Sequence, residues 1–122
     1  MDSTLRRTWA EIDMDALAHN YETLRKRIGE NVKFLGVVKA DAYGHGANVI
    51  AEHYEKYIDR IGVASLEEGI ELRSSGIKMP ILILGYTSPN QYELLILNRP
   101  FGRFFLYYFF PVVLKRHLMF TI

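Results

Sequence analysis

The feature that most constrains the fold is an apolar run at residues 34–38, which ends at Lys39. No polar residues alternate with the apolar ones, a pattern typical of a strand buried on both faces in a parallel sheet. A turn of small residues follows, and then a helical pattern begins. Because α/β sheets and barrels bind ligands at the carboxyl ends of their parallel strands, Lys39 is predicted to lie at a ligand-binding edge. Its amine could form a Schiff base with an aldehyde there, whereas most lysines that end a strand are simply solvated.

Strand and helix patterns alternate through the rest of residues 13–98. Strands are predicted to start near residues 33, 61 and 81, and helices to end near residues 28, 57, 76 and 98. This order is typical of right-handed βαβ units and of a parallel sheet. Weak alternation at residues 7–13 predicts one further short strand at the amino terminus.

Local signals predict where two of the helices begin. Asp13 is placed as the N-cap of the first helix, and Gly29 supplies the position just after its end. Ser65 and Glu68 have the spacing of a capping box, which predicts the start of the third helix. Val49 is expected on the apolar face of the second helix.

The composition excludes several classes of protein. With 122 residues, 49% of them hydrophobic, the chain can bury one core, but a complete (β/α)₈ barrel needs about 250 residues. The absence of cysteine excludes disulfides, and residues 1–7 do not resemble a signal peptide, so we expect a cytoplasmic protein. A net charge of +1 gives no indication of a nucleic-acid partner. His45 has no second ligand at a usual spacing, and His53 is interpreted as a packing residue on the apolar face of a helix, so we expect no metal site.

Residues 99–122 differ from the rest of the chain. They hold four basic residues, no acidic residue and eight of the sixteen aromatic residues, whereas residues 1–98 hold 11 basic and 14 acidic residues. Their apolar run at 104–114 contains a proline and is shorter than the span of about 20 residues that crosses a membrane, so we expect no membrane partner. We predict a domain boundary after residue 98. We interpret 99–122 as a replaced or frame-shifted carboxyl end, without a partner strand and prone to aggregate.

Two segments of the chain have distinctive wording. The ten residues around Lys39 read Val37-Val38-Lys39-Ala40-Asp41-Ala42-Tyr43-Gly44-His45-Gly46. An upstream segment reads Trp9-Ala10-Glu11-Ile12-Asp13, followed by Ala16, Leu17 and Asn20. The first closely resembles the pyridoxal-phosphate attachment motif of the alanine racemases, and the second resembles the amino-terminal signature of the same family. The similarity extends over about residues 7–98.

This resemblance implies the fold and the site. Residues 1–98 would form an α/β fold, a partial (β/α)₈ TIM-type barrel with about three parallel strands and a short amino-terminal strand. Pyridoxal 5′-phosphate would be bound as a Schiff base on Lys39, and the freed lysine amine would be the base for one face of the alanine Cα. The hydroxyl of Tyr43 would bind the cofactor phosphate, and Leu84 would pack against the cofactor.

The resemblance also implies what these residues lack. In the family, a tyrosine from the carboxyl-terminal domain of a partner subunit is the base for the opposite face. Arginines beyond the matched segment contact the pyridine nitrogen and the substrate carboxylate. We therefore expect a truncated racemase that is inactive alone, and for which the family homodimer is doubtful.

Other functions remain open. Serine racemases with a membrane domain carry much the same lysine motif, so the substrate could be alanine or serine. The alternative functions are a non-catalytic fragment that binds pyridoxal phosphate, and a single-barrel pyridoxal-phosphate homeostasis protein.

Overall fold

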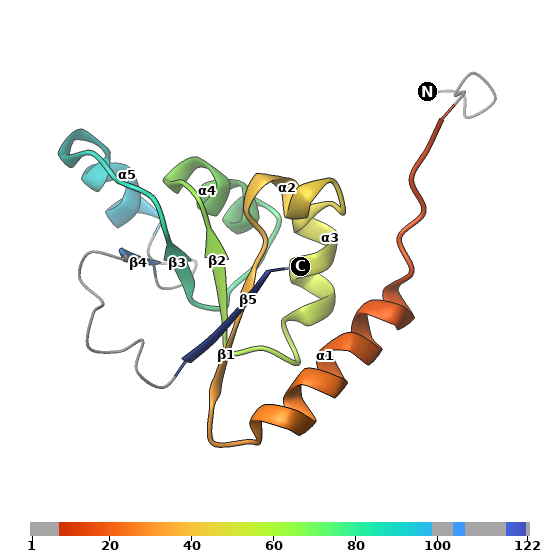
Figure 1. The fold of residues 1–122 in the computed structure, drawn as a ribbon. Coiled ribbons are helices and arrows are strands. Elements are labelled where there is room, and N and C mark those ends of the chain that lie inside the picture. Colours follow the sequence, from red (N-terminus) through yellow and green to blue (C-terminus); the bar gives the residue numbers. More distant parts are fainter. Residues whose placement is uncertain (1–7, 99–103, 107–116, 122) are drawn as a thin grey trace.

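The protein is an α/β structure in a computed structural model that describes residues 8–98, 104–106 and 117–121 (Figure 1). Its helices are α1 (Met14–Ile28), α2 (Lys39–Tyr43), α3 (Ala47–Tyr54), α4 (Leu66–Ser74), the 3₁₀ helix η2 (Pro89–Gln91) and α5 (Tyr92–Leu97). Its strands are β1 (Lys33–Val37), β2 (Arg60–Val63), β3 (Ile81–Ile83), β4 (Phe104–Leu106) and β5 (His117–Thr121).

The five strands form one sheet in the order β4-β3-β2-β1-β5, and every neighbouring pair is parallel. The three strands expected from residues 33, 61 and 81 are therefore confirmed, at the centre of the sheet. In register, Gly36 pairs with Ile61 and Gly62 pairs with Leu82. This register brings the carboxyl ends of β1, β2 and β3 to one edge, where ligand sites of such sheets lie.

Helix α1 begins and ends where its sequence signals predict. The Asp13 carboxylate accepts the N–H of Ala16 at 2.9 Å, which satisfies one of the unpaired amides at the helix start. Gly29 follows the helix with φ of 78°, and its N–H donates to the carbonyl of Arg25 at 2.9 Å. On the buried side, Tyr21 is 6% exposed and Leu17 packs against the core.

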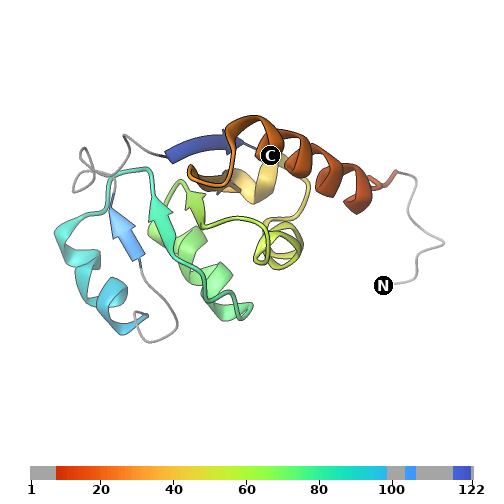
Figure 2. The same cartoon turned by 90° about the horizontal axis from the view of Figure 1, so that it is seen from below.

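The helices cover one face of the sheet and form the main core with it. Figure 2 shows α1, α3, α4 and α5 following one another along one side of the curved sheet. The strands contribute alternate residues to this core, and α3 and α4 contribute several buried residues each. The largest fully buried side chains of this core are Phe34, Val38, Ile50, Tyr54, Ile61, Val63, Leu66, Leu72, Ile81 and Ile83.

The other face of the sheet is also buried. Leu35, Val37 and Leu82 lie outside the helix-side core, yet each is at most 2% exposed. Burial on both faces explains why the strand segments read as continuous apolar runs rather than as alternating ones.

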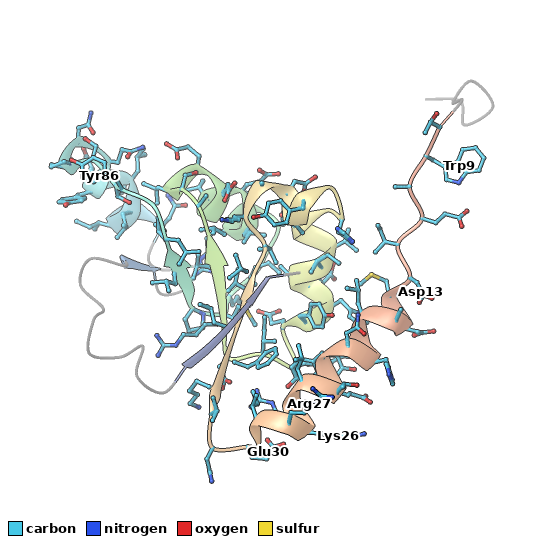
Figure 3. The ribbon with its side chains drawn as sticks, in the orientation of Figure 1. Trp9, Asp13, Lys26, Arg27, Glu30 and Tyr86 are labelled. Atoms are coloured by element: carbon cyan, nitrogen blue, oxygen red, sulfur yellow. The ribbon has the colours of Figure 1, made fainter. Side chains whose placement is uncertain are left out.

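Two expectations about local structure are wrong. Residues 8–13 form no strand: they are not among the five strands of the described sheet, and a strand requires a neighbour for its hydrogen bonds. Trp9 on this segment is 67% exposed and lies away from the sheet and helices (Figure 3). Helix α3 ends at Tyr54 rather than near residue 57, and Val49, expected on its apolar face, is 59% exposed.

The carboxyl-terminal segment contributes to the sheet, contrary to the expectation that it has no partner strand. Strand β4 pairs with β3, and β5 pairs with β1 over all five of its residues. Parallel pairing of this kind joins segments far apart in the sequence, so no local pattern announces it. The domain boundary after residue 98 stays a prediction.

Candidate functional site

Strand β1 leads directly into a left-handed turn. Four consecutive residues have positive φ, namely Ala40 at 53°, Asp41 at 55°, Ala42 at 50° and Tyr43 at 52°. For residues with a Cβ this conformation costs about 1–2 kcal/mol each, so contacts from the surrounding structure must hold it in place. Lys39 is the first residue of this turn, which overlaps the turn of small residues expected after Lys39.

Hydrogen bonds from both sides of the turn hold it in place. The carbonyl of Val38 accepts the N–H of Ala42 at 2.9 Å. The Asp41 carboxylate accepts the N–H of Ala47, the first residue of α3, at 2.7 Å. Gly46 donates its N–H to the Asp41 carbonyl at 3.1 Å. The turn is thus fastened to the end of β1 behind it and to the start of α3 ahead of it.

A third contact comes from Glu68 in the first turn of α4. One carboxylate oxygen accepts the N–H of Ala40 at 2.9 Å, and the other accepts the N–H of Ala64 at 2.7 Å. The Ser65 hydroxyl accepts the N–H of Glu68 at 3.3 Å, which confirms half of the expected capping box. The other half differs, because the Glu68 carboxylate bonds to Ala64 and Ala40 instead of turning back to Ser65. No sequence signal points to the Ala40 contact.

Two of the predicted site residues project from this turn. Lys39 is partly buried, and its Nζ lies 6.0 Å from the centroid of the Tyr43 ring. Tyr43 is 56% exposed. The distance is at the outer limit of a cation–π contact. An amine and a phenol that both reach solvent therefore lie near each other at the carboxyl end of β1.

Leu84, the third predicted site residue, directly follows β3. Its N–H donates to the carbonyl of Val63 at 2.8 Å. Gly62 explains how its side chain reaches β1: a Cβ at Gly62 would lie 3.6 Å from Cδ1 of Leu84 and 3.2 Å from Cγ2 of Val37. Because Gly62 has no side chain, the side chains of Val37 and Leu84 approach each other over the middle strand. Leu84 therefore lies at the same edge of the sheet as Lys39.

A cavity of about 310 Å³ lies beside the turn, between α2, α3 and α4. Lys39, Tyr43 and Leu84 do not line it. Its walls are Val38, Ala40, Asp41, Ala47, Asn48, Val63, Glu68, Glu71 and Leu72. Since Val38, Val63 and Leu72 belong to the helix-side core, this cavity is on the outer side of the turn and apart from the predicted cofactor residues.

Among the described residues, no group of three or more histidine, cysteine, aspartate or glutamate residues could hold a metal ion. No helix in the same part of the chain is both long enough and apolar enough to cross a membrane.

Comparison with known proteins identifies the family. The family model described as "Alanine racemase, N-terminal domain" matches residues 12–99. The chain belongs to this family. The match includes the whole turn from Lys39 to Tyr43 and also Leu84, and it confirms the resemblance found in the two sequence motifs.

Curated alanine racemases are similar to this part of the chain. Alanine racemase 1 of Caldanaerobacter subterraneus subsp. tengcongensis is 51% identical over 88 residues, which are 71% of this chain and 23% of the relative. The alanine racemase of Halothermothrix orenii is 50% identical over 91 residues, or 74% of this chain and 24% of the relative. The chain thus spans about a quarter of the length of these relatives.

Solved alanine racemase structures match the fold as well. The alanine racemase of Clostridium difficile 630 has a TM-score of 0.75 and 47% identity, over 78% of this chain and 26% of that one. The alanine racemase of Bacillus anthracis with bound L-Ala-P has a TM-score of 0.73 and 35% identity, over 81% of this chain and 25% of that one. The expected barrel relationship is confirmed for a part of the barrel.

Proposed function

We propose that this chain is the cofactor-binding part of an alanine racemase and that Lys39 is the residue to which pyridoxal 5′-phosphate attaches. The observation that carries the proposal is the position of Lys39, in a turn at the carboxyl end of β1, within a segment that matches the alanine racemase family model. Ligands of parallel α/β sheets bind at this edge.

The residues of the turn fit such a cofactor. The amine of Lys39 is only partly buried and is free to react with an aldehyde. Tyr43 exposes more than half of its side chain, so its hydroxyl is available to donate to a phosphate oxygen. Leu84 offers an apolar surface at the same edge. We assign covalent attachment to Lys39, phosphate binding to Tyr43 and packing against the cofactor to Leu84.

Racemisation requires a proton to leave one face of the substrate Cα and another to return to the opposite face. The bound cofactor supplies stabilisation of the negative charge left at Cα. The amine of Lys39 would hold or return the proton at one face. Alanine is the substrate we propose, because the relatives are named alanine racemases and the Bacillus anthracis structure holds L-Ala-P.

Reductive trapping tests the attachment. Purified 122-residue chain is incubated with pyridoxal phosphate, treated with sodium borohydride and digested, and the labelled lysine is found by mass spectrometry. We expect the label mainly on Lys39 and expect Lys39→Ala to remove it, whereas Lys78→Ala, which changes an exposed lysine, should retain it. Label spread evenly over the other lysines of the wild-type chain would refute the assignment.

An activity assay separates a racemase from a non-catalytic cofactor-binding fragment. We expect the isolated chain, with pyridoxal phosphate added, not to convert L-alanine to D-alanine measurably. Among the described residues only Lys39 is proposed as a base, and loss of one positioned group costs about a hundredfold in rate. Racemisation that disappears in Lys39→Ala would show that this chain alone supplies both faces. A chain that is labelled on Lys39 but does not racemise alanine would support the proposal that it is the cofactor-binding part of a racemase.

A further inference from the structure

Glu68 occupies the point where strands β1 and β2 separate. In the β1–β2 register Val37 pairs with Gly62, so continuation of the ladder would direct the Ala64 N–H to the carbonyl of Val38. That carbonyl instead accepts the N–H of Ala42 in the left-handed turn. The Ala64 amide therefore loses its ladder partner, and the Glu68 carboxylate takes that place at 2.7 Å.

The second oxygen of the same carboxylate holds the turn. It accepts the N–H of Ala40, the residue that follows Lys39 and begins the run of positive φ. Two hydrogen bonds from backbone amides to one carboxylate are charge-assisted and stronger than bonds between neutral groups. This series of hydrogen bonds extends to the segment after β3, because the carbonyl of Ala64 accepts the N–H of Gly85 at 3.0 Å.

We propose that Glu68 is a positioning residue for Lys39. Its carboxylate fixes the peptide between Lys39 and Ala40 against the end of β2, and so fixes the direction in which the lysine side chain leaves the backbone. Without this contact the strained turn loses its only described bond to α4, and both Lys39 and Tyr43 gain freedom. This inference rests on the proposed function of Lys39.

The test compares Glu68→Gln with wild type and with Glu71→Gln. Glutamine keeps the shape of glutamate but presents one acceptor and one N–H₂ donor, so it cannot accept from both amides. Glu71 is a matched control because it lies on the same helix and lines the same cavity. The measured quantity is the pyridoxal phosphate concentration that half-saturates the borohydride-trapped label on Lys39. We expect Glu68→Gln to raise it about tenfold and Glu71→Gln to leave it within about twofold.

Two further measurements keep the outcomes distinct. Thermal unfolding checks that Glu68→Gln is folded. Labelling of the other lysines should be the same in Glu68→Gln as in wild type, because a loss of global stability would change the labelling of all lysines, whereas a loss of positioning changes only Lys39. Hydrogen exchange on wild-type protein, without cofactor, should find the amides of Ala40 and Ala64 both protected.

An unchanged half-saturation in folded Glu68→Gln would overturn the inference, as would rapid exchange at Ala40. If the wild-type chain carries no label on Lys39, the proposed function fails instead. In that case the exchange at Ala40 still decides whether Glu68 holds the turn.

Discussion

Phe34 and Asp59 hold each other by two hydrogen bonds. The N–H of Asp59 donates to the Phe34 carbonyl at 2.9 Å, and the Asp59 carboxylate accepts the Phe34 N–H at 2.8 Å. The same carboxylate is 3.2 Å from Nζ of Lys33 and 3.4 Å from a guanidinium nitrogen of Arg25. The Asp59 carboxylate thus joins the start of β1 to the start of β2. The Glu68 carboxylate joins the segments that follow the carboxyl ends of the same two strands.

Asp59→Asn should lower the free energy of unfolding by about 1–3 kcal/mol at pH 7, because the Phe34 amide keeps only a neutral acceptor. Burial would raise the pKa of Asp59, but the hydrogen bonds from Phe34 and Lys33 and the charges of Lys33 and Arg25 hold it below its usual 3.8. The stabilisation is therefore complete above pH 3.8 and is lost as the pH falls through the lower folded-state pKa.

Urea unfolding at several pH values measures this difference. Glu52→Gln, which changes an exposed carboxylate on α3, is the control and should behave as wild type. A difference between wild type and Asp59→Asn that stays constant down to pH 2 would contradict the prediction.

Tyr54→Phe should destabilise the protein by about 1 kcal/mol, because the fully buried Tyr54 hydroxyl donates to the Leu17 carbonyl at 2.6 Å and joins α3 to α1. Burial raises the pKa of Tyr54 to about 12. The contribution of its protonated form is complete below the usual pKa of 10.0 and is lost as the pH rises from there to about 12.

Alkaline unfolding checks this difference. Wild type should lose stability more steeply than Tyr54→Phe above pH 10, and Tyr92→Phe, at a position 41% exposed, should follow wild type. Identical alkaline unfolding of wild type and Tyr54→Phe would rule out a raised pKa for this hydroxyl.

Gly85→Ala should cost about 2 kcal/mol or more, because its Cβ would lie 2.3 Å from the carbonyl oxygen of Ala64, which is backbone and cannot move aside cheaply. Gly76→Ala is the control: nothing lies within 4 Å of its Cβ, and only the φ of +93° opposes it, at about 1 kcal/mol. Chemical denaturation compares the two. Equal losses would show that the close approach at Ala64 relaxes without cost.

Removal of residues 99–122 should lower stability and promote association. The shortened chain loses β4 and β5, so the unpaired N–H and C=O groups of β3 and β1 become edges for pairing with other molecules. At the same concentration, sedimentation velocity should show larger assemblies of the shortened chain than of the full chain. The midpoint of unfolding in urea should be lower for the shortened chain. A shortened chain that is equally stable and no more associated would indicate that these two strands contribute little.

The sequence alone was sufficient where the stabilising groups are close together along the chain. Asp13 caps Ala16 three residues away, and the apolar residues before Lys39 form a strand buried on both faces, as predicted. The attachment of a cofactor to Lys39 was inferred from a motif within a single turn and stays a proposal. The strand expected at residues 7–13 is wrong for the described residues 8–13, because they have no pairing partner in the described sheet.

Only the tertiary structure decided the contacts between residues distant in sequence. The Glu68 carboxylate meets the amide of Ala40 because β1 and β2 lie side by side, and the spacing that predicted a helix cap could not reveal a second acceptor role. Local backbone preference opposes the left-handed conformation that begins at Ala40, so hydrogen bonds from other parts of the structure must hold it in place. The pairing of β5 with β1 brings together segments far apart in the sequence, which costs conformational entropy. Only the contacts of the assembled sheet offset this cost, so residues 117–121 by themselves do not predict the pairing.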